Sequence, residues 1–313
     1  MRIAVIGAGN WGKNLVANLH ELGVLAAIAE PNDLLRKELK QKYPDVEVFD
    51  NHNQIMDSDI PAIVIATPVV THYDLVKMSL ENGKDVFVEK PITLKTLEAE
   101  DLARIADTEN KILMVGHLLL YQPAIKFIKN ALKDGLIGEL KGLHQERLNL
   151  GRARSVENVM WSFGVHDIAV LNYLVASPLK DFEVVGQNIL QDSVEDDVYL
   201  HMKFENDVQA HLHSSWLWPE KQRKLAIIGS SGMLVYDELE QTVIHHKKTI
   251  SKDLQNQDEG QKIVFEGAAQ PLKLEMQHFL EVIKTRNKPV SDAWSAVDVI
   301  RILEDAGEVL KSG

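Results

Sequence analysis

The chain has 313 residues, with 34 Lys and Arg against 46 Asp and Glu, so its formal net charge is −12. This acidic balance argues against a general nucleic-acid-binding protein, which needs a broad basic surface. There is no cysteine, which excludes disulfides, thiol nucleophiles and Cys-ligated metals. No apolar run approaches the roughly 20 residues of a membrane span, and the N-terminus lacks a signal-peptide core. We therefore expect a cytoplasmic protein with no membrane partner and no metal.

The first 120 residues alternate between short apolar runs and helical patterns. The apolar runs predict buried strands at residues 2–6, 24–29, 46–49, 62–66, 85–88 and 112–115. Helical spacing predicts helices at residues 13–22, 33–42, 74–81 and 94–106. Strands that are apolar on both faces and alternate with helices are typical of a doubly wound parallel sheet. We therefore expect an α/β, Rossmann-type domain over residues 1–120.

The pattern changes after residue 120, where alternation of period two predicts strands. These strands cover residues 141–148, 181–190, 198–204, 208–216, 224–228 and 233–236, with helices at 123–133, 164–175, 272–284 and 293–310. Residues 247–270 are polar without periodicity and predict an exposed loop. We expect residues 121–313 to form an α+β domain with a large, mostly antiparallel open sheet, whose C-terminal helices are able to pack back on the first domain. One face of this sheet should be covered by another subunit, giving a homodimer or homotetramer.

Gly7, Gly9 and Gly12 form a G-x-G-x-x-G pattern with Asn10 and Trp11 inside it. The pattern follows a predicted strand and opens a helix, which is the context of a dinucleotide-binding turn. The three glycines allow a tight turn, close approach of the pyrophosphate and close packing of helix on strand. Asn10 and Trp11 are expected beside the cofactor, although Trp11 has packing on the neighbouring helix as its alternative.

Glu30 ends the second predicted strand, 23 residues after Gly7. An acid at this position accepts hydrogen bonds from the adenosine ribose hydroxyls and repels the 2′-phosphate of NADP. The nearest basic residue that could hold such a phosphate is Arg36. The sequence therefore predicts NAD in preference to NADP.

Glu89, Lys90 and Pro91 lie at the carboxyl end of a buried strand, the edge where doubly wound sheets bind ligands. A lysine near the nicotinamide can hydrogen-bond a substrate hydroxyl and polarise it. The alternative is a surface Glu–Lys pair.

Positive charge is concentrated between residues 141 and 154, where Lys141, Arg147, Arg152 and Arg154 interrupt an acidic sequence. Arginine binds a diphosphate bidentately, so a basic strand and loop suit a nucleotide substrate. For Arg152 and Arg154 a solvated basic face is an equal alternative. Arg147 alternates with Leu148 on a strand and is expected to point into a substrate cleft.

The sequence resembles the Gfo/Idh/MocA oxidoreductases over essentially the whole chain. The resemblance rests on the glycine turn, Ala66-Thr67-Pro68 with His72, Glu89-Lys90-Pro91 and the C-terminal antiparallel sheet. It implies a Rossmann domain and a substrate domain whose sheet forms the oligomer interface. It also implies that Thr67, Pro68 and His72 pack around the cofactor and that Lys90 is catalytic.

The resemblance further implies a histidine on a helix of the second domain that faces the nicotinamide, here His166. Many relatives carry aspartates four residues before and three residues after it, where this chain has Ser162 and Ala169, with Asp167 directly adjacent. The sugar-alcohol members are therefore a poorer match.

Residues 116–123, 146–152 and 161–167 are similar to nucleotide-sugar 3-dehydrogenases, which oxidise the 3-hydroxyl of UDP-N-acetylglucosamine or its uronic acid. A partner aminotransferase then aminates the 3-keto product. This similarity and the basic residues together give the expected substrate contacts, which are Tyr121, Arg147, Asn149, Arg152, Arg154, Trp161 and Asp167. For Tyr121 a helix-entry aromatic is the alternative.

These observations predict an NAD-dependent dehydrogenase that makes the 3-keto form of a UDP-N-acetylhexosamine, for cell-surface polysaccharide or lipopolysaccharide synthesis. Lys90 and His166 are expected to meet in the cleft between the domains and to act on one hydroxyl, with either residue as the base. The alternatives are a dehydrogenase of a free sugar or cyclitol and a non-catalytic NAD-binding regulator.

Overall fold

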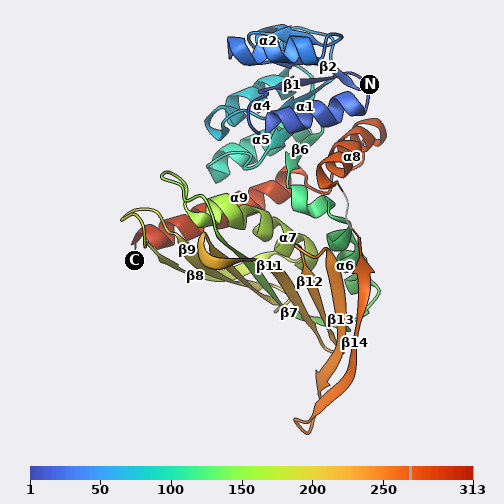
Figure 1. Cartoon of the computed structure of the whole chain (residues 1–313), viewed down its shortest axis with the longest axis vertical. Helices are drawn as coiled ribbons and strands as arrows, with labels where there is room; N and C mark the ends of the chain where they lie inside the picture. The colour runs from blue at the N-terminus through green and yellow to red at the C-terminus, as the bar shows by residue number, and fades with distance from the viewer. Residues whose placement is uncertain (268–269, 313) are drawn as a thin grey trace. The chain divides into compact units, whose positions relative to one another are not determined.

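The computed structural model of the protein describes residues 1–267 and 270–312 (Figure 1). The chain divides into two compact units. Unit 1 contains residues 1–118 and 271–304, and unit 2 contains residues 119–270 and 305–313. Residues 271–304 therefore group with the first unit; the sequence places them after the boundary at residue 120, in C-terminal helices able to pack back on the first domain.

Unit 1 is built on a six-stranded sheet with the order β3-β2-β1-β4-β5-β6, in which all neighbours are parallel. The strands are β1 (Ile3–Ile6), β2 (Leu25–Ala29), β3 (Glu47–Phe49), β4 (Ala62–Ile65), β5 (Asp85–Glu89) and β6 (Leu113–Gly116). All residues of β1, β4 and β6 are buried, as expected for strands covered on both faces. The strand order reverses between β1 and β4, which is the position where doubly wound sheets bind ligands.

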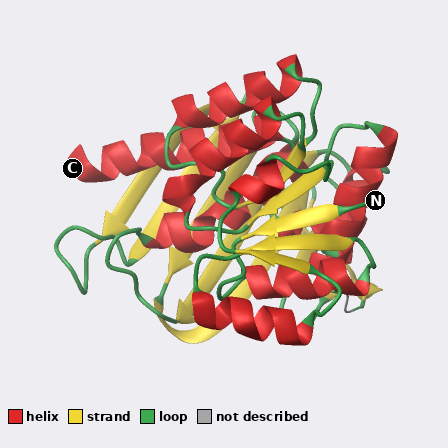
Figure 2. Ribbon diagram, turned by 90° about the horizontal axis from the view of Figure 1, so that it is seen from above, coloured by secondary structure: helices red, strands yellow, loops and turns green. Residues whose placement is uncertain are grey.

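Helices lie along both faces of this sheet (Figure 2). They are α1 (Gly12–Glu21), α2 (Asp33–Lys42), α3 (Asn53–Met56), α4 (His72–Glu81), α5 (Thr96–Thr108) and α8 (Pro271–Thr285), with the 3-10 helix η1 (Val69–Thr71). The last helix, α9 (Ala293–Ser312), contributes residues to both units. In α8, Phe279 packs on Phe87 of β5 with ring centroids 5.8 Å apart, so this C-terminal helix shares the core of the parallel sheet. The predicted doubly wound fold is confirmed.

Unit 2 contains an eight-stranded sheet with the order β14-β13-β12-β11-β7-β10-β9-β8. Its strands are β7 (Leu140–Leu150), β8 (Leu179–Gln187), β9 (Asp197–Phe204), β10 (Gln209–Ser215), β11 (Leu217–Gly229), β12 (Met233–Asp237), β13 (Thr242–Ile250) and β14 (Asn256–Glu266). Only β7 and β10 pair in parallel, which confirms the predicted, mostly antiparallel sheet.

The helices of unit 2 pack on one face of this sheet (Figure 1). They are α6 (Pro123–Lys133) and α7 (Val165–Val175), preceded by the 3-10 helix η2 (Leu118–Tyr121) and the π-helix η3 (Met160–Gly164) respectively. Among the helices of the described residues, none is long and apolar enough to cross a membrane.

The expectation of a loop over residues 247–270 is wrong. Strands β13 and β14 pair as an antiparallel hairpin at the edge of the sheet. Residues 256–262 of β14 are exposed on both faces. A strand without a buried face lacks the alternation of apolar and polar residues from which strands are predicted, so the sequence reads as a loop. Residues 268 and 269, which the expected loop included, lie outside the described residues.

Candidate active site

The glycine-rich turn joins β1 to α1 in unit 1. Gly7 has a φ of +88°, and a Cβ added there would lie 2.9 Å from the carbonyl oxygen of Ala66. A Cβ on Gly12 would lie 2.1 Å from the carbonyl oxygen of Gly7, so the helix packs against the turn without room for a side chain. By contrast, a Cβ on Gly9 would meet no described atom within 4 Å. The turn is therefore tight at Gly7 and Gly12 and open at Gly9, as close approach of a pyrophosphate requires.

The amino end of α1 is also suited to a phosphate. Among the described residues no side chain forms a capping hydrogen bond to this helix. Helix amino ends carry unsatisfied N–H groups and a positive partial charge, so they bind anions. The turn and the helix together fit a dinucleotide.

Glu30 follows β2 and is buried beside the turn. Its Oε2 accepts a hydrogen bond from the backbone N–H of Ala8 at 2.9 Å, and its Oε1 accepts one from Asn32 at 3.0 Å. Each carboxylate oxygen has more than one acceptor site, so both can still accept from ribose hydroxyls.

The guanidinium of Arg36 forms hydrogen bonds within the same loop. Its Nη1 donates to the carbonyl oxygens of Glu30 at 3.0 Å and Pro31 at 2.7 Å, and its Nη2 donates to Asp33 at 3.1 Å. Arg36, the nearest basic residue that could bind the 2′-phosphate of NADP, therefore already binds the loop. This favours NAD over NADP.

Trp11 connects the turn to β5. Trp11 is 43% exposed, and its Nε1–H donates to Glu89 Oε1 at 2.5 Å. The other carboxylate oxygen of Glu89 accepts from the backbone N–H of Lys90 at 3.3 Å. Glu89 thus links the glycine turn to the residue predicted to be catalytic, a role that the sequence does not reveal.

Lys90 lies directly after β5 among buried titratable groups of unit 1. Burial raises the pKa of Glu89 to about 7, against the opposing effects of Trp11 and Lys90. Burial, and then the charge of Glu89, raise the pKa of Glu275 on α8 well above its usual range. Burial and the charge of Lys90 lower the pKa of His117 to about 3, so this histidine is neutral.

Sequence reasoning missed His117 and Glu275 as neighbours of Lys90 and Glu89. In α8, Glu275 occupies the same buried stripe as Phe279 and Val282. A glutamate in an apolar helical stripe is a signal of a special environment, and it was available in the sequence. Its partner could not be inferred, because Glu89 and Glu275 are far apart along the chain.

His72 ties two loops of unit 1 together. Its Nδ1 lies 2.9 Å from the carbonyl oxygen of Pro91, and its Nε2 lies 2.9 Å from that of Thr67. Burial lowers the pKa of His72, although its backbone partners favour the charged ring. The imidazole therefore fixes the segment after Lys90 against the loop after β4, where Thr67 and Pro68 lie. Their predicted packing around the cofactor remains a proposal.

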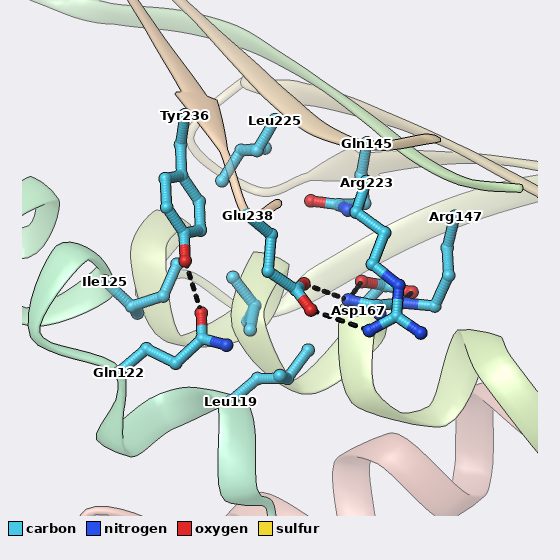
Figure 3. A pocket seen from close by; sticks show the side chains of 11 residues that line it. Leu119, Gln122, Ile125, Gln145, Arg147, Asp167, Arg223, Leu225, Tyr236 and Glu238 are labelled. Carbon is cyan, nitrogen blue, oxygen red and sulfur yellow. Dashed lines mark hydrogen bonds and ion pairs between the residues drawn. The ribbon is translucent and has the colours of Figure 1, made fainter. Parts of the chain in front are cut away.

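The most polar part of the core of unit 2 is a network around Arg147 on β7 (Figure 3). Arg147 donates to Asp167 through Nε at 2.6 Å and Nη2 at 2.9 Å, and Nη2 also donates to Glu238 at 2.8 Å. Arg223 on β11 donates to the other oxygen of Glu238 at 2.7 Å. The side chains of Arg147 and Asp167 are only 5% and 1% exposed.

Burial and the neighbouring charges shift the pKa values in this network in different directions. Burial alone would lower the pKa of Arg147, but Asp167 and Glu238 outweigh it and the pKa is raised. Burial acts to raise the pKa of Glu238, yet the two arginines lower it. For Asp167, burial outweighs Arg147 and raises the pKa. Two guanidinium groups thus face two carboxyl groups inside the core.

The sequence predicts that Arg147 and Asp167 contact substrate, whereas in the structure their charged groups bind each other. Sequence reasoning missed Glu238 and Arg223. Arg223 is the cross-strand partner of Arg147. Two like charges placed opposite each other need a counter-ion, and Glu238 supplies it, but this requires the strand register, which the sequence does not provide.

The remaining predicted substrate residues are distributed over unit 2. His166 is half-buried in the first turn of α7, Trp161 is half-buried in η3, Tyr121 is buried at the end of η2, and Asn149 is half-buried on β7. Arg152 and Arg154 follow β7, with Arg152 exposed and Arg154 3.5 Å from Glu157 in an ion pair.

A doubly wound sheet with this turn at its switch point and an acid after β2 defines a dinucleotide-binding protein of the kind found in oxidoreductases. Comparison with known families agrees with this class. Residues 1–117 match the model described as the oxidoreductase family with an NAD-binding Rossmann fold, and residues 125–235 match the GFO/IDH/MocA C-terminal domain. The chain belongs to the Gfo/Idh/MocA oxidoreductase family, and its cofactor is NAD.

Known proteins with similar sequences include dehydrogenases of two substrate types. UDP-N-acetylglucosamine 3-dehydrogenase of Acidithiobacillus ferrooxidans is 26% identical over 79% of this chain and 77% of its own. The NAD(+)-dependent scyllo-inositol 2-dehydrogenase of Bacillus subtilis is 25% identical over 93% of this chain and 88% of its own. The solved structure of the Acidithiobacillus enzyme superimposes with a TM-score of 0.88 at 23% identity, covering 100% of this chain and 98% of that one.

Proposed function

We propose that this oxidoreductase is an NAD-dependent dehydrogenase that oxidises the C3 hydroxyl of a UDP-N-acetylhexosamine to a ketone. The observation that carries the proposal is Lys90 at the carboxyl end of β5, linked through Glu89 to the glycine-rich turn. The similarity to a UDP-N-acetylglucosamine 3-dehydrogenase through 79% of the chain supports the choice of substrate.

Two residues carry the proposed proton chemistry. Bound NAD would supply the hydride acceptor for the carbon that bears the hydroxyl. Lys90 and His166 act on the hydroxyl itself, one by accepting its proton and the other by donating a hydrogen bond to the oxygen as negative charge develops. Help of this kind is typically worth ~10²–10⁴-fold in rate.

The nucleotide end of the substrate is assigned to the loop after β7. Arg152 is exposed and carries a guanidinium suited to a diphosphate, and Arg154 lies two residues further. Tyr121, Asn149 and Trp161 offer hydroxyl, amide and indole groups for the sugar.

A second copy of the chain is proposed to cover the free face of the sheet in unit 2. Helices α6 and α7 pack on one face. The opposite face carries exposed apolar side chains, including Val185 on β8 (63% exposed) and Tyr199 on β9 (42%). Antiparallel sheets tolerate one solvated face, but exposed Val and Tyr side chains on neighbouring strands favour a partner surface.

One alternative substrate class has support of its own. The scyllo-inositol dehydrogenase matches 93% of the chain, so a free cyclitol or sugar is the second candidate. A non-catalytic NAD-binding regulator is less well supported, because it would need neither Lys90 nor His166.

The test is a panel of UDP-sugars, free sugars and cyclitols with NAD, followed by the absorbance of the reduced nicotinamide. We expect turnover with UDP-N-acetylglucosamine or its uronate. The double variant Arg152→Ala/Arg154→Ala should raise the KM for the UDP-sugar, while Lys252→Ala, which removes an exposed charge from the β13–β14 turn, should not. Turnover with inositol and none with any UDP-sugar would select the alternative.

A further inference from the structure

The first turn of α7 carries two consecutive polar residues with different environments. His166 is half-buried, whereas Asp167 is fully buried against Arg147. Consecutive side chains of an α-helix point about 100° apart around its axis, because there are 3.6 residues per turn. Whatever fixes the rotation of this helix turn about its axis therefore also sets the direction in which the Cα–Cβ bond of His166 leaves the helix.

Asp167 is held by a bidentate contact. Both of its oxygens accept from Arg147, at 2.6 and 2.9 Å. Two parallel hydrogen bonds from a planar guanidinium define the orientation of a carboxylate as well as its position. This contact ties the start of α7 to β7.

Arg147 is itself held by Glu238, which also binds Arg223 (Figure 3). Glu238, which follows β12, accepts from Arg147 at 2.8 Å and from Arg223 of β11 at 2.7 Å. The backbone N–H of Glu238 also donates to the carbonyl oxygen of Arg223 at 3.0 Å. Arg147 is thus fixed by the sheet and has little freedom to turn toward another ligand.

The start of α7 buries the apolar side chains of Val165 and Ile168. Among the described residues, no side chain caps α7 at Gly164, and the preceding turn is the π-helix Met160–Gly164. Single π-helical turns occur frequently at functional sites. A buried ion pair is also a weak source of stability, because well-packed apolar residues of similar size are often as stable. The pair is therefore better explained by geometry than by stability.

We propose that Arg147 and Asp167 are positioning residues that orient His166 toward the substrate hydroxyl, with Glu238 and Arg223 holding Arg147 in place. The proposal rests on the proposed function, because it takes His166 to act on that hydroxyl. It replaces the expectation that Arg147 and Asp167 contact the substrate directly.

The test compares the pair in two backgrounds. The double variant Arg147→Met/Asp167→Leu removes both charges without leaving one unpaired, so it should fold. In the otherwise unchanged protein we expect kcat to fall about tenfold to hundredfold, the loss typical of a misplaced reacting group, with the KM for NAD unchanged. In a His166→Asn background the same change should alter the residual turnover by no more than roughly twofold, the usual error of additivity.

The two backgrounds separate positioning from stability, because general weakening of unit 2 would lower turnover equally in both. Arg147→Lys, which keeps the charge but cannot make the bidentate contact, provides a second variant if the double variant does not fold. It should lower kcat in the otherwise unchanged protein and have no such effect in the His166→Asn background. The matched control is Lys248→Met/Asp258→Leu, which removes the 3.0 Å ion pair of the β13–β14 hairpin and should leave kcat unchanged.

Each contrary result has a distinct meaning. Equal losses in both backgrounds, or a large rise in the KM of the UDP-sugar at unchanged kcat, would overturn the positioning role. Near-normal turnover of the single variant His166→Asn would instead overturn the proposed function of that histidine. The two failures are therefore distinguishable.

Discussion

Replacement of Glu30 should change cofactor preference by an amount that the structure allows us to estimate. The carboxylate is buried beside the turn and is held by the N–H groups of Ala8 and Asn32. In the proposed cofactor site it would therefore meet the adenosine ribose in a fixed position. Glu30→Ala removes the acceptor for the ribose hydroxyls and the negative charge that opposes a 2′-phosphate.

The loss for NAD follows from the value of hydrogen bonds to a charged group, about 1.5–3 kcal/mol. At 1.4 kcal/mol per tenfold change, the Kd of NAD should rise about tenfold to hundredfold in Glu30→Ala. NADP should bind no worse than before, because the repulsion is removed. The ratio of the two Kd values should therefore fall by at least about tenfold.

Isothermal titration of NAD and NADP with the unchanged protein, Glu30→Ala and Glu30→Gln measures this directly. Glu30→Gln retains one acceptor and removes the charge, so it should recover part of the NAD affinity while still accepting NADP better than the unchanged protein does. Equal affinity of the unchanged protein for both cofactors, or an unaltered ratio in Glu30→Ala, would refute the role assigned to Glu30.

Three further predictions concern pH, loop structure and assembly. Because burial raises the pKa of Glu89 from 4.5 to about 7, its contribution to stability is fully present below pH 4.5 and is lost as the pH rises through 7. The free energy of unfolding of the cofactor-free protein should thus fall by up to about 3 kcal/mol between pH 4.5 and 8 because of this group. Urea unfolding should show a flatter pH dependence in Glu89→Gln than in the unchanged protein, whereas the exposed control Glu109→Gln should behave like the unchanged protein. Identical pH dependence in the unchanged protein and both variants would exclude the effect. In His72→Leu the fold-decrease in kcat should exceed the fold-increase in the Kd of NAD, because His72 holds Pro91 beside Lys90. An unchanged kcat would show that this contact is dispensable. Light scattering at micromolar concentration should give a dimer or tetramer, which Val185→Glu weakens; a monomeric unchanged protein would remove this proposal.

The fold of unit 1 was predictable because its signals are local. Each buried strand is an apolar run, and each glycine of the turn is required by its immediate backbone. A Cβ at Gly12, for example, would collide with Gly7 only five residues away. The positions of Glu30 and Lys90 were predictable for a related reason, since both follow strands whose carboxyl ends meet at one edge of the sheet; their roles remain proposals.

The features that were not predictable depend on contacts across long sequence separations. The pairing of Arg147 with Glu238 requires the register of three strands, and the approach of Glu275 to Glu89 requires α8 to join the first unit. The hairpin of β13 and β14 was missed because a strand exposed on both faces has no hydrophobic period. The contact of Arg147 with Asp167 could not be inferred either, because the partner lies 20 residues away on a helix and the local sequence pattern does not indicate it.

The central claim is that the hydride removed by this enzyme comes from C3 of a UDP-N-acetylhexosamine. The most direct measurement uses UDP-N-acetylglucosamine, or its uronate, deuterated at C3, with the purified protein and NAD. Mass spectrometry then determines whether the label appears in the reduced cofactor. The account predicts transfer of the C3 deuterium to the nicotinamide, together with slower turnover than the unlabelled sugar. Reduction of NAD with the label retained in the sugar, or no reduction with either sugar nucleotide, would contradict it.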